Sequence, residues 1–125
     1  MKIRVYYEDT DAGGIVYHTR YINFCERARS EIFFEQGMMP GEGSKSGFVV
    51  RNIKAGFLAT STLGDMLEVT STILSQKSSS MVLLQEIFKE DTRVFSMEVT
   101  LVYIENGRPR RIPDRFQVIF DSFED

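Results

Sequence analysis

Apolar and polar residues alternate along much of the chain, which is the pattern of strands that bury one face. In residues 66–76, for example, Leu67 and Val69 alternate with Glu68 and Thr70. Similar segments predict five strands, at residues 2–7, 48–58, 66–76, 81–89 and 93–103. A further short strand is expected at residues 116–120.

One long segment, from Tyr21 to Gln36, follows a helical period instead. Its apolar residues recur every three or four positions and form one stripe, which comprises Tyr21, Phe24, Cys25, Ala28 and Ile32. Gly37 and Pro40 follow the segment, and both residue types are common just beyond a helix C-terminus. Residues 38–47 contain several Gly and Ser residues and are predicted to form a loop.

The predicted order is one strand, one long helix and then a series of strands joined by short turns. Residues 90–92 form a tight turn signal, and Asn106-Gly107 is a hairpin signal, although Pro109 and Pro113 favour a loop or a sheet edge there. Strands joined by short turns are antiparallel, so we expect an α+β protein with one antiparallel sheet and the helix on one of its faces. No linker is visible, and residues 1–125 are interpreted as a single domain.

The composition argues against several classes of protein. The formal net charge of −3 is unlike the basic surplus of a general nucleic-acid binder. The single cysteine, Cys25, cannot form an internal disulfide, which fits a reducing compartment. Residues 1–4 lead into a strand pattern without the apolar segment of a signal peptide, and no apolar run has the length of a membrane span. We therefore expect a cytoplasmic protein without stable membrane insertion.

Residues 6–18 combine three carboxylates, two adjacent glycines and the only histidine of the chain. Asp11 stands just before Gly13-Gly14, and a glycine pair allows a sharp turn or a positive φ. A carboxylate beside a turn that leads into a helix can activate water or attack a substrate, while free amides at the helix N-terminus can stabilise an oxyanion. Aspartate also caps local amides in turns without any catalytic role. Asp9 would point the same way as Asp11 if the preceding strand continued this far.

His18 is the only histidine, so any mechanism that needs an imidazole must use it. A residue just before a helix more often caps or packs than catalyses, and the backbone amide of His18 is a better candidate than its imidazole, because amides in the first turn of a helix have no partner within the helix. One histidine and one cysteine seven residues apart do not supply the clustered ligands of a zinc site, so no metal is expected. Cys25 lies on the apolar stripe, where a cysteine usually packs and does not react.

The same segment resembles a known family of enzymes. The motif reads Val5-Tyr6-Tyr7-Glu8-Asp9-Thr10-Asp11-Ala12-Gly13-Gly14-Ile15-Val16-Tyr17-His18, followed by Tyr21 and Glu26-Arg27-Ala28-Arg29. It closely resembles the hot-dog-fold acyl-CoA thioesterases of the 4-hydroxybenzoyl-CoA thioesterase type. Within that group it is most similar to the YbgC-like proteins associated with the bacterial Tol-Pal envelope system. The motif covers about the first quarter of the chain, and the length, helix and strand order agree with the family over the rest.

The resemblance implies a fold and a set of site residues. The hot-dog fold wraps an antiparallel sheet of about five strands around one long central helix. The catalytic aspartate of the family corresponds to Asp11, acting as nucleophile or general base, and the amide that polarises the thioester carbonyl corresponds to that of His18. Gly14, Tyr17 and Lys77 correspond to substrate-binding positions, with Lys77 directed to the CoA phosphates. Serines follow Lys77 where some relatives are richly basic.

The function implied by the resemblance is hydrolysis of short- or medium-chain or aromatic acyl-CoA to the free acid and CoA. No cofactor is expected, since CoA is part of the substrate. Two alternatives are hydrolysis of acyl groups carried by acyl carrier protein, and a non-catalytic scaffold for acyl carriers or envelope-biogenesis proteins. Active sites in the family lie at a dimer interface where two sheets join edge to edge, so we expect a homodimer or a dimer of dimers, that is, a homotetramer.

Overall fold

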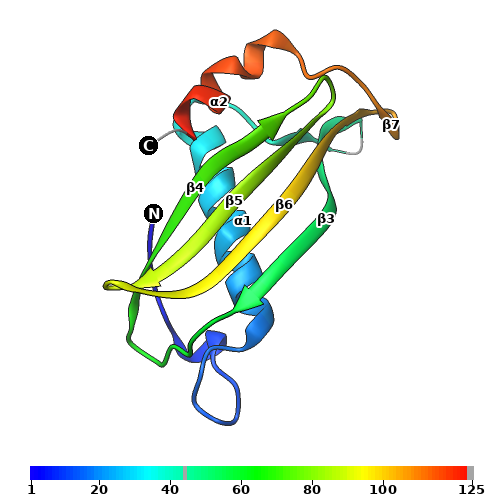
Figure 1. The fold of residues 1–125 in the computed structure, drawn as a ribbon. Helices are drawn as coiled ribbons and strands as arrows, with labels where there is room; N and C mark the ends of the chain where they lie inside the picture. Colours follow the sequence, from blue (N-terminus) through cyan, green and yellow to red (C-terminus); the bar gives the residue numbers. More distant parts are fainter. Residues whose placement is uncertain (44, 124–125) are drawn as a thin grey trace.

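The protein is a curled antiparallel sheet with one long helix on its concave face (Figure 1). This computed structural model describes residues 1–43 and 45–123. The helices and strands, in chain order, are β1 (Lys2–Arg4), α1 (His18–Glu35), β2 (Gly41–Glu42), β3 (Ser46–Phe57), β4 (Met66–Gln76), β5 (Ser80–Lys89), β6 (Thr92–Glu105), β7 (Arg108–Pro109) and α2 (Gln117–Ser122). The predicted α+β class, with one antiparallel sheet and one central helix, is confirmed.

The sheet follows the order β1-β4-β5-β6-β3-β2, and β7 pairs with the end of β6. Every pairing is antiparallel, and the long strands β4, β5 and β6 follow one another through short turns. The two strands that were not predicted, β2 and β7, have only two residues each. Strand β7 forms at the Asn106-Gly107 turn, where Asn106 and Gly107 both have positive φ.

The hydrophobic core lies between α1 and the inner face of the sheet. The predicted apolar stripe of α1 faces inward, with Tyr21, Phe24 and Cys25 all buried. Opposite them, alternate residues of the central strands are fully buried, among them Leu83 and Phe95. No helix in the described part of the chain combines the length and the apolar character needed to cross a membrane.

The prediction of a strand at residues 116–120 is wrong. This segment forms a short 3-10 turn that continues into α2. The apolar positions Phe116, Ile119, Phe120 and Phe123 are all buried, and their spacing of three and four residues is that of a helix. Packing of this helical face on the core outweighs the alternation of Phe116, Val118 and Phe120, so that Val118 lies exposed.

Both outer edges of the sheet are partly open among the described residues. On one side, β1 pairs only with residues 66–68 of β4, and Val69 donates its amide to Met1. On the other side, β2 pairs only with Ser46 and Gly47 of β3. The stretches 70–76 and 49–57 therefore have no neighbouring strand on their outer side.

Candidate active site

Residues 10–16, here called the Asp11 loop, form a tight excursion just before α1 (Figure 1). Thr10 and Val16 pair across its base, and the amide of Asp11 donates to the carbonyl of Ile15 at 2.9 Å. The amide of Gly14 donates back to the carbonyl of Asp11 at 3.0 Å. Gly14 has a φ of +84°, which a residue with a side chain rarely adopts. The glycine pair therefore does produce the sharp turn predicted from the sequence.

The carboxylate of Asp11 is exposed and is oriented by its own loop. Its Oδ1 accepts the Gly13 amide at 2.8 Å and the Ile15 amide at 3.4 Å. The other oxygen, Oδ2, has no hydrogen bond to the described residues, so it is free to meet a substrate or water. A Cβ on Gly13 would lie 3.2 Å from Oδ1 of Asp11. A side chain at position 13 would therefore push the Asp11 carboxylate aside by a few tenths of an ångström.

Asp9 does not join Asp11, because the first strand ends at Arg4 and residues 7–9 form a 3-10 turn. Asp9 is 4% exposed, and its Oδ1 accepts two bonds from Arg20, at 3.0 and 2.9 Å. Its Oδ2 accepts the amide of Tyr6, and its carbonyl accepts the amide of Tyr17. Asp9 therefore anchors the base of the Asp11 loop to the first turn of α1.

Helix α1 begins at His18, three residues before the predicted start at Tyr21. Tyr17 is the residue at the N-terminal cap, and it makes no side-chain hydrogen bond there. Among the described residues, the amides of His18 and Thr19 have no acceptor, as expected for a first helical turn. The His18 ring packs on the ring of Tyr17, with centroids 4.6 Å apart, and on that of Phe57, 5.9 Å apart.

A second loop, residues 58–65, supports the Asp11 loop from the side, a role that no local pattern in the sequence indicates. The Val16 amide donates to the Ser61 carbonyl at 2.8 Å, and Ile15 pairs with Thr62. Asp65 fixes this second loop through the Thr62 amide at 2.8 Å and an ion pair with Lys89 at 3.0 Å. The Thr62 amide, followed by the Lys89 cation, holds the pKa of Asp65 below its usual value of 3.8.

The structure thus brings four of the five predicted site residues together, and Lys77 is the exception. Asp11, Gly14, Tyr17 and His18 lie at the N-terminal end of α1. Lys77 follows β4 at the opposite end of the sheet (Figure 1). The 11 residues of β4 separate the two ends by about 35 Å at the usual rise of a strand. Within one chain, Lys77 therefore does not reach the Asp11 loop.

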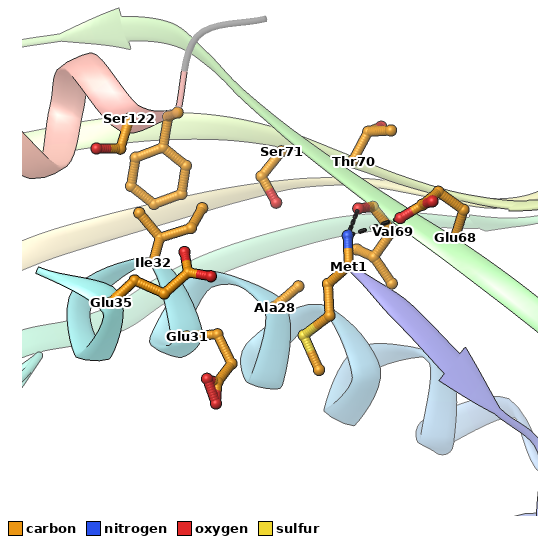
Figure 2. A pocket seen from close by; sticks show the side chains of 11 residues that line it. Met1, Ala28, Glu31, Ile32, Glu35, Glu68, Val69, Thr70, Ser71 and Ser122 are labelled. Carbon is orange, nitrogen blue, oxygen red and sulfur yellow. Dashed lines mark hydrogen bonds and ion pairs between the residues drawn. The ribbon is translucent and has the colours of Figure 1, made fainter.

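A pocket of about 490 Å³ lies on another side of the molecule, between α1, β4 and the end of α2 (Figure 2). The N-terminal amine of Met1 closes one side by donating to Glu68 at 2.7 Å and to the Val69 carbonyl at 2.9 Å. Glu31 and Glu35 of α1 lie along the opposite side (Figure 2). None of the predicted site residues lines this pocket, so its size alone does not make it the site.

The structure also bears on two other kinds of reactive site, a cysteine thiol and a bound metal ion. Cys25 is fully buried, and burial raises the pKa of its thiol to about 12, so it is not a thiolate at neutral pH. In residues 1–43 and 45–123, no three histidine, cysteine or carboxylate side chains come together in a way that could hold a metal ion. The exposed Asp11 carboxylate and the helix amides remain as the reactive groups of the predicted site.

Comparison with known proteins agrees with the motif. The pattern of the thioesterase superfamily matches residues 13–96. The acyl-CoA thioesterase YbgC of Helicobacter pylori (strain ATCC 700392 / 26695) is 38% identical, over 98% of this chain and 99% of its own length. A probable thioesterase from Bartonella henselae is 32% identical, with a TM-score of 0.81 over 90% of this chain and 96% of that chain. A gentisyl-coenzyme A thioesterase is 26% identical, with a TM-score of 0.84 over 96% of this chain and 98% of that chain.

These similarities confirm the resemblance read from residues 5–29, and they extend it over nearly the whole chain. The family pattern begins within the Asp11 loop and continues through α1 into the sheet. The chain therefore belongs to the thioesterase superfamily and is a thioester hydrolase with the hot-dog fold.

Proposed function

We propose that this protein is an acyl-CoA thioesterase in which Asp11 performs the hydrolysis and the amide of His18 stabilises the oxyanion. One observation carries this proposal. The loop that holds the Asp11 carboxylate with a free oxygen leads directly into a helix whose first amides have no acceptor among the described residues. Such amides are pre-oriented donors for negative charge on a substrate oxygen, and losing one such donor typically costs about 3 kcal/mol of transition-state stabilisation.

In the first route, Asp11 acts as a general base. Its carboxylate takes a proton from a water molecule as that water attacks the thioester carbonyl carbon. The C=O electron pair moves to oxygen, where the N–H of His18 donates to it. The tetrahedral intermediate then collapses, the C–S bond breaks, and the CoA thiolate leaves and takes up a proton.

In the second route, Asp11 attacks the carbonyl carbon directly and forms a mixed anhydride as the CoA thiolate leaves. Water then attacks the Asp11 carbonyl carbon of the anhydride, the bond to the acyl carboxylate breaks, and the Asp11 carboxylate is regenerated with one oxygen from water. Single-turnover hydrolysis in ¹⁸O-labelled water, followed by mass spectrometry of the protein, distinguishes the two routes. Label in the peptide that contains Asp11 supports the anhydride, whereas label confined to the released acid supports the general base.

A homodimer through the open edge of β3 completes this proposal. Val49, Val50 and Phe57 leave 41–50% of their surface exposed along this edge, which is unusual for an isolated strand in water. A symmetric pair of β3 strands is antiparallel, so the partner chain runs the other way. In this arrangement, the end of the partner's sheet that carries Lys77 stands at the same height along the shared edge as the Asp11 loop. That lysine can then meet the phosphates of a CoA bound at the loop.

A dimer of dimers follows from a second surface. Val82 and Leu84 point to the convex face of the sheet, because their neighbours in β5 point into the core. Thr100 and Glu98 of β6 stand opposite them, so this face mixes apolar and polar side chains. Contact between two dimers through this face would give the homotetramer.

The substrates we propose are short- or medium-chain or aromatic acyl-CoAs. The similar proteins from Helicobacter pylori and the gentisyl-coenzyme A thioesterase support a CoA ester, and the latter supports an aromatic acyl group. Acyl carrier protein is the alternative carrier of the acyl group. Hydrolysis of acyl-phosphopantetheine at the rate of the matching acyl-CoA would favour the carrier protein, because the CoA nucleotide would then contribute nothing.

The decisive experiment measures thiol release from a panel of acyl-CoAs by the wild type and by Asp11→Asn. We expect Asp11→Asn to lower kcat by about a thousandfold without changing the fold, since amide and carboxylate have the same shape and only the base or nucleophile is lost. Asp91→Asn, at the exposed turn between β5 and β6, is the matched control and should keep full activity. Near-normal turnover by Asp11→Asn would refute the assigned mechanism.

A further inference from the structure

Arg29 is a buried cation inside the fold that the proposed reaction does not use. It lies on α1 and is only 9% exposed. Its Nη1 donates to Oε1 of Gln85 at 3.2 Å. Gln85 is itself completely buried and donates through Nε2 to the carbonyl of Cys25 at 2.8 Å and to Oγ of Ser71 at 2.9 Å. One side of the guanidinium is therefore fixed by a polar network in the core.

The other donors of Arg29 have no protein partner among the described residues. A guanidinium carries five N–H donors, and only the bond to Gln85 uses one. No carboxylate of the described residues lies within ion-pair distance of Arg29. Glu26, one turn earlier on α1, accepts instead from Ser30. Burial lowers the pKa of Arg29, and the nearby negative charge of Glu26 opposes this shift without forming a direct ion pair.

Arg29 lines a pocket of about 150 Å³, here called the Arg29 pocket. Its walls are mostly apolar, with Glu26 and Ser30 as the other polar residues, and the full lining is Glu26, Arg29, Ser30, Phe33, Pro40, Phe48, Val50 and Leu101. A cavity of about this volume with apolar walls holds one benzene molecule. The pocket therefore has room for one ring or for a chain of a few carbons, with a cation at its wall.

The Arg29 pocket is too far along α1 to serve the Asp11 loop of its own chain. His18 and Arg29 are 11 residues apart, which corresponds to about 16 Å along a helix. An acyl group small enough for the pocket does not span that distance. The pocket instead lies beside the open edge of β3, where its wall residue Val50 is 45% exposed.

In the proposed dimer, the N-terminal end of the partner's helix α1, which follows the partner's Asp11 loop, comes level with this pocket. If the two-fold axis of the proposed dimer lies at Ile53, the midpoint of the open stretch 49–57, antiparallel pairing sets the Val50 position of one strand level with the Gly56 position of the other. The residue after Gly56 is Phe57, whose ring contacts His18. The N-terminal end of the partner's helix is therefore level with the Arg29 pocket, across the shared edge.

We propose that the Arg29 pocket receives the acyl group of a substrate that is cleaved by the partner subunit, and that Arg29 selects short acyl groups ending in a carboxylate. This inference rests on the proposed function and its dimer, and it adds the substrate class. A planar guanidinium with free donors matches a carboxylate in charge and geometry, and the apolar walls match the short chain behind it.

The test compares adipoyl-CoA with 6-methylheptanoyl-CoA, which has the same shape but ends in two methyl groups instead of a carboxylate. We expect the wild type to show a kcat/KM at least tenfold higher for adipoyl-CoA, as is typical of a hydrogen bond to a charged group. Arg29→Met should remove this preference by lowering kcat/KM for adipoyl-CoA only, while Arg29→Lys should retain part of it. Arg27→Met changes an exposed arginine two residues away on α1 and should leave the ratio unchanged.

Two results would overturn the proposal. One is a wild type that hydrolyses 6-methylheptanoyl-CoA as well as or better than adipoyl-CoA. This result refutes a preference for a terminal carboxylate even if Arg29→Met does not fold. The other is a folded Arg29→Met protein that loses both activities equally, because Arg29 would then be purely structural. If no acyl-CoA is hydrolysed, the proposed function fails, and calorimetric binding of the two esters to the wild type still tests the pocket. Tighter binding of adipoyl-CoA that Arg29→Met abolishes supports it, and equal binding refutes it.

Discussion

At the scale of single residues, the two adjacent glycines of the Asp11 loop, Gly13 and Gly14, have different structural roles. Gly14 needs its positive φ of +84°, yet a Cβ there would meet nothing within 4 Å. Gly13 is not in the left-handed region, but a Cβ there would press on the Asp11 carboxylate at 3.2 Å. Stability therefore depends mainly on Gly14, and the position of the carboxylate mainly on Gly13.

This difference predicts opposite effects of two alanine substitutions. Gly14→Ala should lower the free energy of unfolding by about 1 kcal/mol, because a residue with a Cβ is strained in the left-handed region. Gly13→Ala should leave stability nearly unchanged and lower kcat about tenfold, because it displaces the carboxylate by a few tenths of an ångström. Urea unfolding and thiol-release kinetics of both variants check this. Equal effects of the two variants on both measurements would contradict it.

Asp65 gives a prediction about pH. Its pKa is lower in the folded protein than its usual 3.8, so the folded state favours the charged carboxylate. Its contribution to stability is fully present above pH 3.8 and is lost as the pH falls from there through the lower pKa of the folded state. Asp65→Asn should therefore be less stable than the wild type at pH 7, and in urea unfolding the difference should shrink steadily as the pH falls below 3.8. A constant difference across this pH range would show that Asp65 acts through packing instead.

Residues whose role depends on local geometry could be recognised from the sequence, whereas residues whose role depends on distant parts of the chain could not. Asp11 and Gly14 could be recognised because an aspartate followed by two glycines specifies a turn by itself. The support from Ser61 and Asp65 depends on a loop about 45 residues further along, which no local spacing encodes. Arg29 stands in the family motif, yet its burial and its hydrogen bond to Gln85 became visible only from its three-dimensional surroundings.

At the scale of elements, the pair of Asp9 and Arg20 holds the Asp11 loop against the start of α1. The side chains of Asp9 and Arg20 are 5% and 23% exposed, so the pair is largely out of water. This contact also explains why α1 begins earlier than its apolar stripe. The Tyr17 amide is taken by the Asp9 carbonyl, which places His18 in the first helical turn without a capping side chain.

Arg20→Met should therefore lower the free energy of unfolding by about 2 kcal/mol, because it leaves the Asp9 carboxylate buried without its cation. It should also lower kcat, since the loop loses its anchor. The matched control is Arg93→Met, which removes a more exposed ion pair with Glu86 and should cost less than about 1 kcal/mol. Chemical denaturation of both variants is the measurement. Similar losses from the two would mean that the Asp9 pair is no more than a surface contact.

The elements also show where periodicity succeeds and where it fails. The long strands and α1 were predicted to within a few residues because their patterns extend over ten or more positions. The segment 116–120 is so short that its apolar residues fit both the period of a strand and the period of a helix. The helix forms because it lets four apolar side chains reach the core together. The short strand β2 leaves no pattern, since two residues cannot alternate in a recognisable way, and β7 had only the Asn106-Gly107 turn signal beside it.

At the scale of the whole molecule, one chain does not contain every part that the proposed reaction needs. The Asp11 loop lies at one end of the sheet, while Lys77 lies at the other end and the Arg29 pocket lies beside the edge of β3. An antiparallel pairing of two copies through that edge places a Lys77 end and an Arg29 pocket level with each Asp11 loop. Activity should therefore require the dimer, even though all the groups that act on the thioester itself come from one chain.

The two edges of the sheet allow a controlled test of this requirement. Both edge strands contain a bulge residue that has no partner in the neighbouring strand, Arg51 in β3 and Leu74 in β4. Proline is best tolerated at such positions, but it removes a donor from the edge and obstructs a neighbouring strand. Arg51→Pro should give a folded monomer with activity reduced at least tenfold, while Leu74→Pro should keep both the oligomer and the activity. Light scattering coupled to gel filtration, run beside thiol-release kinetics, measures both properties. A dimer that survives Arg51→Pro and dissociates with Leu74→Pro would place the interface on β4, and the Lys77 and Arg29 arguments would lose their geometric basis.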